Sequence, residues 1–181
     1  MGEGGKMVQV NWKRLAEPHP LFKPFAPTNL NDIEFYKKLV VFKKNLLTKN
    51  LYVSDEFRNV KYIEAALSKF ILGGKNLLYE IGDFGGIAGF TDILQGFKCD
   101  AIMKLWDKNI WGLDCIKAYK KLLNIVMDEF ELKRIGTSTA DDKIVRMAKM
   151  AGFVEEGTQK YGFMWKGKPM DLMFLGYYKE G

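Results

Sequence analysis

The chain has 181 residues, of which 48% are hydrophobic and 28% charged. This balance is typical of a globular protein and excludes a disordered one, and the length suits one domain with a full core. Lysine and arginine outnumber aspartate and glutamate by 28 to 22, which gives a net charge of +6 at pH 7. Because the basic residues form no compact run, they predict solvated helix faces and do not favour a nucleic-acid partner, although they would attract a small anionic ligand.

The length of the apolar runs and the spacing of the cysteines indicate where in the cell the protein is expected. No apolar run approaches the roughly 20 residues that span a bilayer, and the first ten residues lack the apolar region of a signal peptide. Cys99 and Cys115 have no paired spacing and are expected to be reduced thiols. We therefore expect a cytoplasmic protein without a membrane partner. His19 is the single histidine of the sequence, so we expect no metal site.

The N-terminal part predicts a lead-in and then a helix. Residues 1–20 should be flexible or strand-like and free of helix, because prolines stand at positions 18, 20, 24 and 27. A helix should begin near Asp32, with Thr28 or Asn31 as its cap. The apolar residues at helical spacing on it are Ile33, Tyr36, Val40 and Leu47, which we expect to be buried.

The middle of the chain predicts a second helix and then three strands. The helix begins at Ser54, a good N-cap, and ends at the Gly73-Gly74 pair. From Asn76 onward, β-prone runs alternate with turns at 83–85 and 95–98, which is typical of an antiparallel meander. The expected strands are Leu77–Gly82, Gly86–Leu94 and Cys99–Trp106.

The C-terminal part alternates helices and strands before it ends in a hairpin with a turn at 166–169. Gly152 is a natural left-handed stop for the second of these helices. The expected elements are the helix Leu113–Phe130, the strand Arg134–Thr139, the helix Asp142–Ala151 and the hairpin strands Thr158–Trp165 and Met170–Tyr178. The expected inward residues of the two helices are Ile116, Tyr119, Leu123, Val126, Phe130, Ile144, Met147, Ala148 and Ala151.

This order of elements defines an α+β fold, with one strand–helix–strand unit inside a mostly antiparallel sheet. We find no repeat, low-complexity segment or linker. The expected organisation is therefore an N-terminal lead-in, 1–20, followed by a single domain, 21–181. The strands on either side of the helix from Leu113 should run parallel and splay apart beside Gly112, leaving a V-shaped cleft.

Three stretches of this sequence, residues 78–94, 105–123 and 132–157, together with the hairpin around Gly167, carry a resemblance to a known family. The run Ala151-Gly152-Phe153-Val154-Glu155-Glu156-Gly157 is the most specific part. These residues resemble the GNAT acetyltransferase superfamily, and they look most like the branch that acetylates ribosomal-protein N-termini. The resemblance implies a GNAT-type acyltransferase fold, which is a mixed, mostly antiparallel sheet with helices on both faces. It also implies acetyl-CoA as co-substrate and a primary amine as acceptor.

The family binds the CoA pyrophosphate on backbone amides at the start of a helix, where donors lack intrahelical partners and the dipole is positive. The family pattern Gln/Arg-x-x-Gly-x-Gly/Ala corresponds here to Asn109–Asp114, in which Gly112 matches. By this resemblance, main-chain groups of residues 105–107 should pair with the pantetheine arm, and amides of residues 111–115 should hold the pyrophosphate. The implied cofactor-binding residues are Leu105, Trp106, Asp107, Asn109, Trp111, Gly112, Leu113, Asp114, Cys115 and Asp141.

Asn109 is a short substitute for the Gln or Arg of the family pattern, and three further positions depart from what the family has. Asp114 stands where the second small residue belongs, and its carboxylate about 6 Å from a phosphate would cost about 2–3 kcal/mol at an effective dielectric of 20. That cost shrinks if Asp114 points outward or caps the helix. Asp141 replaces an asparagine that holds the pantetheine arm, and an ionised carboxylate can only accept hydrogen bonds. Ala148 stands where some members have a tyrosine as general acid.

The chemistry requires a group that takes a proton from the attacking amine. Asp100 is the nearest match for the carboxylate that some relatives place on the fourth strand. Glu80 and Asp92 are alternatives, and each of the three also fits a plain surface or turn carboxylate. Four aromatic residues fit either an acceptor pocket or core packing, namely Trp106, Trp111, Tyr161 and Trp165.

Two functions remain open at this point. The first is an N-acyltransferase that moves an acetyl group from acetyl-CoA to a primary amine of a small molecule, peptide or protein. The alternative is a non-catalytic module of the same fold that has lost or changed CoA binding. The departures from the family pattern at Asp114, Asp141 and Ala148 favour this alternative. The sequence leaves open the identity of the amine and whether the chain forms a homo-oligomer.

Overall fold

The computed structural model describes residues 10–26, 32–48 and 76–179, with side chains as far as residue 45 in the second range. The predicted helix from Ser54 to Gly73-Gly74 lies outside the described residues. So do the two predicted caps, Thr28 and Asn31, and the side chain of Leu47.

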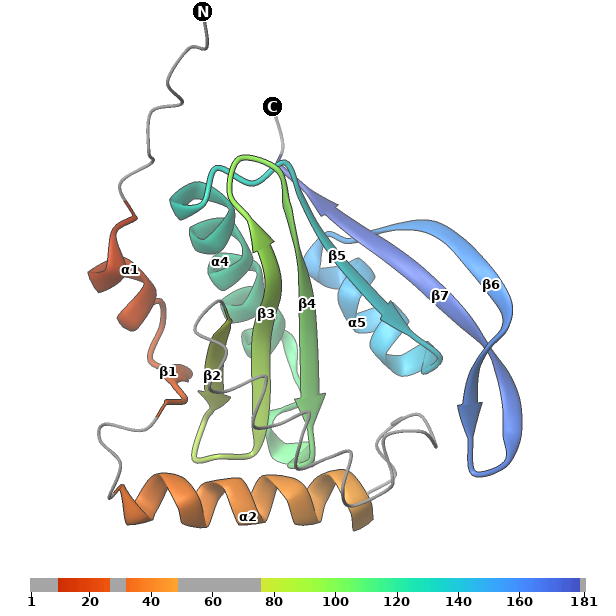
Figure 1. The fold of residues 1–181 in the computed structure, drawn as a ribbon, viewed down its shortest axis with the longest axis horizontal. Helices are drawn as coiled ribbons and strands as arrows, with labels where there is room; N and C mark the ends of the chain where they lie inside the picture. Colours follow the sequence, from red (N-terminus) through yellow and green to blue (C-terminus); the bar gives the residue numbers. More distant parts are fainter. Residues whose placement is uncertain (1–9, 27–31, 49–75, 180–181) are drawn as a thin grey trace, which may run out of the picture.

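One sheet of seven strands organises the described chain, in the order β1-β2-β3-β4-β5-β7-β6 (Figure 1). Neighbouring strands are antiparallel except for β4 and β5, which pair in parallel. The predicted α+β class with a mixed, mostly antiparallel sheet is therefore confirmed. The strands are β1 (Phe22–Pro24), β2 (Leu77–Ile81), β3 (Gly86–Leu94), β4 (Lys98–Leu105), β5 (Arg134–Thr139), β6 (Val154–Trp165) and β7 (Lys168–Tyr178).

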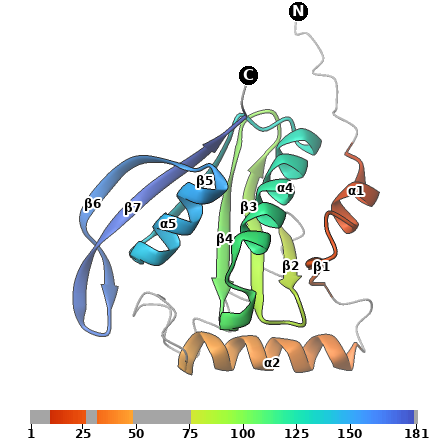
Figure 2. The same ribbon diagram turned by 180° about the vertical axis from the view of Figure 1, so that it is seen from behind.

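Helices cover both faces of the sheet, as predicted. Figure 2 shows α4 and α5 together on one face, whereas α2 crosses the ends of the central strands. Because side chains alternate along a strand, Ala88 of β3 joins the core under α4 while its neighbour Ile87 joins a separate cluster with α2. The described helices are α1 (Trp12–Ala16), α2 (Ile33–Thr48), the 3₁₀ helix η2 (Lys108–Ile110), α4 (Leu113–Glu129) and α5 (Asp142–Ala151). None of these helices has the length and apolar character needed to span a membrane.

The prediction that residues 1–20 contain no helix is wrong, because α1 lies within them. Asn11 accepts a hydrogen bond from the Arg14 amide and caps the helix (3.2 Å). The prolines follow α1 instead of interrupting it, and proline restricts only its own position and the preceding residue. Leu15 is buried, and the Arg14 guanidinium bonds both Glu129 (3.0 Å) and Asp128 (3.2 Å) of α4, so apolar and ionic contacts hold α1 against the core.

The predicted start of α2 near Asp32 is confirmed, and Asp32 itself is the cap, since its Oδ1 accepts a hydrogen bond from the Phe35 amide (2.9 Å). The predicted buried stripe is wrong. Ile33 and Val40 are 70% and 67% exposed, whereas Phe35 and Phe42 are buried. Both sets have helical spacing, so periodicity alone cannot choose between them. Aromatic contacts decide it, because Phe35 packs on Phe25 (4.9 Å between centroids) and Phe42 on Trp106 (5.7 Å).

From Leu77 onward the predicted elements are confirmed within about two residues, apart from the hairpin. Gly152 ends α5 with φ of +107°, as its left-handed role requires. The hairpin turn is shorter than the predicted 166–169, because Trp165 pairs with Lys168. Its two central residues, Lys166 and Gly167, have φ of +50° and +71°, which is the two-residue geometry that suits the twist of antiparallel strands.

Candidate active site

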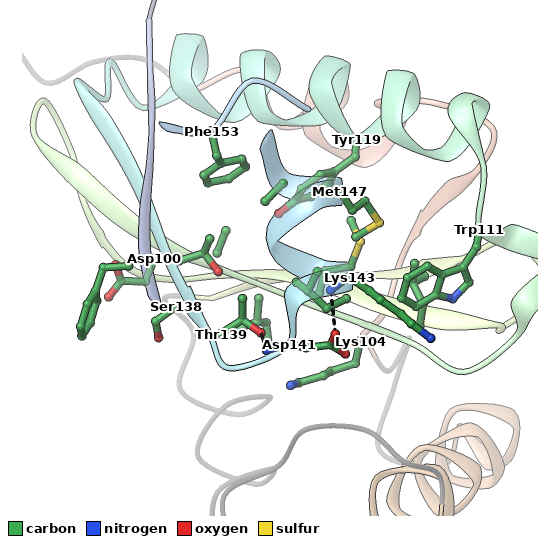
Figure 3. Close-up of a pocket in the computed structure, with 18 of the residues that line it drawn as sticks. Asp100, Lys104, Trp111, Tyr119, Ser138, Thr139, Asp141, Lys143, Met147 and Phe153 are labelled. Atoms are coloured by element: carbon green, nitrogen blue, oxygen red, sulfur yellow. Dashed lines mark hydrogen bonds between the residues drawn. The ribbon is translucent and has the colours of Figure 1, made fainter. Parts of the chain in front are cut away.

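The parallel pairing of β4 with β5 is short and leaves a cleft. The two strands are in register only at Lys98–Arg134, Cys99–Ile135 and Asp100–Gly136. Beyond that point β4 continues to Leu105 and β5 to Thr139 without pairing to each other. A cavity of about 990 Å³ occupies the space between them, with residues of both strands and of α4 and α5 in its walls (Figure 3). The predicted V-shaped splay of the two strands is confirmed.

The cleft exposes the edges of two strands to the same space. On its far side β5 pairs with β7 as far as Thr139, so among the described residues only the edge of β5 that faces β4 lacks a neighbouring strand. Backbone groups at such an edge need partners, and an extended chain that carries amides can supply them in the manner of an added strand. The cleft is therefore suited to a long, narrow ligand with amide groups.

The cavity has an apolar wall and a polar wall. The apolar wall is made by side chains from the helix-covered face, namely Tyr119, Met147, Ala148 and Phe153. Alternation along β4 sends Ala101 and Leu105 into the core on that face and Asp100, Ile102 and Lys104 to the opposite face. Since side chains from both faces line it, the cavity passes through the split in the sheet. The remaining polar lining comes from β5, the start of α5 and the loop after β4, with Thr137, Ser138, Thr139, Asp141, Lys143, Lys108 and Arg134.

At the mouth of the cleft, α4 begins without a side-chain cap. Gly112 is its N-cap and makes no capping hydrogen bond, and its backbone is fully extended (φ 178°). A Cβ added to Gly112 would meet nothing within 4 Å, so the space beside this residue is open. The first amides of α4 therefore point out of the helix without intrahelical acceptors, and the positive end of the dipole lies with them. This arrangement favours an anionic group at the start of α4.

The loop between β4 and α4 already uses some of the amides that were assigned to a cofactor. The Trp106 and Asp107 amides both donate to the Gly85 carbonyl (3.0 Å each), and the Trp111 amide donates to the Lys108 carbonyl (3.2 Å). Asp107 Oδ1 also accepts from the Asn109 amide (2.9 Å) and caps η2. The Asp107 carbonyl accepts from the Ile110 amide (3.4 Å), so the carbonyls near Leu105 and the amides after Trp111 are the groups that remain for the predicted cofactor contacts.

Of the ten residues predicted to bind the cofactor, the structure places four in the cavity wall: Leu105, Trp106, Trp111 and Asp141. Trp106 is fixed there because its indole nitrogen donates to the Phe84 carbonyl (2.8 Å). The other six lie around the mouth or outside the wall. Asn109, Gly112, Leu113 and Asp114 are exposed, Asp107 is partly buried, and Cys115 is buried in the core under α4.

The interpretation of Asp114 as the helix cap is wrong, because Gly112 holds that position and Asp114 lies in the first turn. Its carboxylate is exposed and forms no hydrogen bond with the residues that the structure describes. A free acid in the first turn is stabilised by the helix dipole without any specific contact. The outward-pointing alternative, which reduces its repulsion toward a phosphate, is the one that the exposure favours.

Asp141 has a structural role that was not among the sequence predictions, although aspartate directly before a helix is a common N-cap. It caps α5 by accepting a hydrogen bond from the Lys143 amide (2.8 Å), and its own amide donates to Thr139 Oγ1 (3.1 Å). Across the cavity wall, burial lowers the pKa of Lys104, and the nearby charge of Asp141 partly offsets that effect. The carboxylate therefore balances a lysine at the cleft as well as capping the helix.

Asp100, the predicted base, lies at the last paired position of β4 and β5, where the split begins. A Cβ on Gly136 would lie 2.8 Å from Asp100 Oδ1 and 2.6 Å from Arg134 Nη1, so both side chains cover the same small patch. Arg134 is itself bonded to Glu156 (Nε to Oε1, 2.7 Å) and lowers the pKa of that carboxyl to about 2. Asp100 thus sits beside a cation at the inner end of the cleft.

The two alternative bases lie away from the cavity. Glu80 is buried on β2 and bonded to Lys38 of α2 (2.6 Å), and Asp92 is exposed on β3. Among the four aromatic candidates, Trp106 and Trp111 line the cavity, whereas Tyr161 and Trp165 belong to the hairpin strand β6 and do not. Among the described residues, no group of three or more His, Cys, Asp or Glu side chains is placed to hold a metal ion.

Sequence reasoning missed Lys104, the hydroxyls of β5 and the cavity-facing position of Tyr119. The helical stripe predicted correctly that Tyr119 is buried. No sequence signal could show that its ring borders a cleft, because the cleft forms only where β4 and β5 diverge.

No model of a known protein family matches this chain. Nor does any curated protein sequence. Solved structures do match it. A spermidine N-acetyltransferase from Vibrio cholerae, solved with CoA and spermine, superimposes with a TM-score of 0.65 at 14% identity, over 78% of this chain and 90% of that one.

Two further solved structures agree with this match. The microcin C7 self-immunity acetyltransferase, solved with acetyl-CoA and AMP, has a TM-score of 0.63 at 19% identity and covers 90% of this chain and 94% of its own. An acetyltransferase of the GNAT family from Streptococcus pneumoniae has a TM-score of 0.62 at 19% identity, over 81% and 95%. Identities this low establish a fold and not an activity, and the finer resemblance to the ribosomal-protein branch stays a prediction. The described chain has the fold of the GNAT acetyltransferases.

Proposed function

We propose that this protein is an acyl-CoA-dependent N-acetyltransferase that transfers an acetyl group from acetyl-CoA to a primary amine. The observation that carries the proposal is the split between β4 and β5, which opens at the uncapped start of α4. This combination offers two strand edges for a chain with amide groups and a set of free amides for its phosphates. CoA has those two parts in that order.

In the proposed complex the pyrophosphate lies against the amides of residues 112–115, where Gly112 lets the phosphates approach the backbone. The pantetheine arm extends into the split, along the carbonyls near Leu105 on one side and the edge of β5 on the other. The charges of the wall support this orientation. Because Arg134 is paired with Glu156, three lysines, Lys104, Lys108 and Lys143, face the two carboxylates Asp100 and Asp141, which leaves an excess of one positive charge beside an anionic ligand.

The acetyl group then lies within the cavity, and the amine enters from the opposite end or from the face on which Lys104 lies. Transfer requires the neutral amine, because only its lone pair attacks the thioester carbonyl. Asp100 is proposed to accept the displaced proton, directly or through water, since it is the one of the three candidate carboxylates that lines the cavity.

The alternative is a non-catalytic module of this fold that has lost or changed CoA binding, and Asp114 is the observation that favours it. An exposed carboxylate about 6 Å from a phosphate costs only about 0.7 kcal/mol at the dielectric of water, compared with about 3 kcal/mol at an effective dielectric of 20. Because Asp114 is exposed, the smaller value applies, and it would weaken CoA binding by about threefold. That loss is too small to abolish binding, so we place the enzyme first.

Titration calorimetry with acetyl-CoA and with CoA tests the proposal, together with amide chemical shifts of the labelled protein. We expect binding, with the largest shifts in residues 112–115 and along β5. Acetylation of a panel of amines, which should include polyamines, amino acids and peptides, then tests catalysis. Binding without transfer to any amine would favour the module. Saturating acetyl-CoA that moves no amide at the start of α4 would overturn both the cofactor site and the enzyme.

A further inference from the structure

The two faces of the sheet differ where the strands part. On one face, α4 and α5 cover β4, β5 and β7 (Figure 2). The other face of these strands contributes five side chains to the cavity wall that are not buried, namely Asp100, Ile102, Lys104, Ser138 and Phe174. We call these five residues the open row. They form the part of the wall that an acceptor can reach without passing the two helices.

The open row has an acid at one end and a base at the other. Asp100 lies at the last position where β4 and β5 pair. Ile102 follows two residues later, level with Ser138 of β5, which pairs with Phe174 of β7. Lys104 lies two residues further toward the mouth of the cleft. Because each residue of a strand adds about 3.3 Å, the backbones of Asp100 and Lys104 are about 13 Å apart, with apolar side chains between them.

The inner end of the open row carries a surplus of negative charge. The Arg134 guanidinium bonds Glu156 (Nε to Oε1, 2.7 Å), and Glu156 also accepts a hydrogen bond from the Tyr178 hydroxyl. A Cβ on Gly136 would contact both Arg134 and Asp100, so the Asp100 carboxylate lies beside the same guanidinium. Two carboxylates therefore flank one cation. The negative charge that remains can hold the ammonium form of an incoming amine.

The other end of the open row carries positive charge. Figure 3 shows Lys104 close to Asp141, whose carboxylate already caps α5 by accepting a hydrogen bond from the Lys143 amide (2.8 Å). Burial lowers the pKa of Lys104, and the charge of Asp141 offsets only part of that effect. A second negative charge beside the ammonium would favour its charged form further. The pantetheine arm proposed for the split is uncharged, so it does not supply that charge.

We propose that the acceptor is a small amphoteric amine, which binds with its amino group at Asp100 and with an anionic group, a carboxylate or a phosphate, at Lys104. An apolar spacer joins the two groups and lies against Ile102 and Phe174. In the transfer, the amine nitrogen bonds the acetyl carbon, and the carbon–sulfur bond breaks with its electron pair on sulfur. The proton that Asp100 takes from nitrogen reaches the thiolate through water. This inference rests on the proposed function and names the substrate class of its site.

The same charges disfavour a polyamine. An amine with a second ammonium group at the end of its spacer would place that group beside Lys104, and two charges of one sign repel each other strongly where water is partly excluded. An amine with an uncharged end would avoid the repulsion but would gain no charged hydrogen bond there. The order of preference is therefore anionic, then neutral, then cationic. Lys104 is the residue that determines this order.

Four amines that carry the same hydrocarbon chain test the order. They are aminohexanoate, aminohexyl phosphate, hexylamine and diaminohexane, and they differ in the far end of the molecule. The measured quantity is kcat/KM for transfer from acetyl-CoA. We expect the wild type to prefer the better of the two anionic amines over hexylamine by about ten- to a hundredfold, the worth of a hydrogen bond between charged groups. Diaminohexane should be the poorest acceptor. The better anionic amine identifies the anion as a carboxylate or a phosphate.

Variants of Lys104 test which residue makes the choice. Lys104→Met keeps the length of the side chain and removes its charge, so the preference for the anionic amine should disappear. The loss should appear mainly in KM, because this contact is the same before and during the transfer. Lys104→Arg keeps the charge and should retain the preference. The control Lys121→Met removes the same charge from an exposed position of α4 outside the cavity wall, and should retain it as well.

The outcomes separate this inference from the proposed function. If acetyl-CoA does not bind, or none of the amines tested is acetylated, the proposed function fails and this inference fails with it. If transfer occurs but hexylamine or diaminohexane is as good an acceptor as the anionic amines, the proposed function stands and the amphoteric class is wrong. A preference that survives in Lys104→Met, or that is lost equally in Lys121→Met, would overturn the role of Lys104.

Discussion

Neutralising Asp114 should tighten CoA binding by a small, salt-dependent amount. The carboxylate is exposed in the first turn of α4, beside the amides proposed to hold the pyrophosphate. At about 6 Å in water the repulsion is about 0.7 kcal/mol, which corresponds to about threefold in affinity. Although Asp114→Asn should tighten binding, it should lower the free energy of unfolding by about 0.3–1 kcal/mol, because the helix dipole stabilises an acid in the first turn.

The assay is the CoA dissociation constant of the wild type and of Asp114→Asn at low and at high salt, with Asp92→Asn as the matched control. Asp92 is exposed on β3, so Asp92→Asn changes the net charge by the same amount but leaves the carboxylate beside α4 in place. Asparagine also tolerates the positive φ of 51° at this position. We expect the gain at Asp114 to shrink as salt screens it. A gain no larger than in the control would refute the position of the phosphates, and a gain of a hundredfold would refute the exposed position of the carboxylate.

Three further predictions concern other parts of the molecule. Gly112→Val should weaken CoA binding more than tenfold, because the valine side chain fills the space beside the start of α4, and it should cost about 1 kcal/mol in helix capping. The control Met150→Val, on the exposed face of α5, should leave the affinity unchanged. Calorimetry measures both affinities, and equal values for the two variants would contradict the placement of the phosphates beside Gly112. In urea unfolding, Phe42→Ala should lower the free energy of unfolding by about 3–5 kcal/mol, because Phe42 is buried, and Val40→Ala by less than about 0.5 kcal/mol, because Val40 is exposed. A larger loss for Val40→Ala than for Phe42→Ala would mean that α2 packs on its other face. The ion pair with Arg134 lowers the pKa of Glu156 from 4.5 to about 2, so it stabilises the folded state above pH 4.5, and that contribution is lost as the pH falls toward 2. Between pH 4.5 and 2 the melting temperature should therefore fall less steeply for Glu156→Gln than for the wild type. Parallel curves for the two proteins would count against the Arg134–Glu156 ion pair.

The parts of the fold that could be predicted from the sequence are those in which one pattern has one physical solution. The helix α4 has apolar residues along one face and lysines along the other, so its orientation is determined. Gly152 ends α5 because a left-handed residue is required there. The face of α2 could not be predicted, since Phe35 and Val40 belong to two apolar stripes of equal spacing, and only the aromatic side chains of distant strands select one.

The candidate site divides in the same way. The loop around Gly112 is local in sequence, so its place between a strand and a helix could be predicted. The roles of Asp141 and Tyr119 depend on where other elements come to lie. Asp141 balances the charge of Lys104 from another strand, and Tyr119 borders the cleft only because β4 and β5 part beside it. Spacing along the chain carries no information about such encounters.

The shortness of the β4–β5 pairing has a mechanical consequence. In the part of the chain that the structure describes, β5, β7 and β6 are joined to the rest of the sheet through only three paired positions, from Lys98–Arg134 to Asp100–Gly136. A sheet joined so narrowly can flex at that seam, and a ligand that bonds both edges would act as a missing strand and stiffen it. Amides of β5 should then exchange with deuterium more slowly in the complex, while those between β2 and β3 keep their rates, so that occupancy of the cleft is registered as rigidity across the whole C-terminal half.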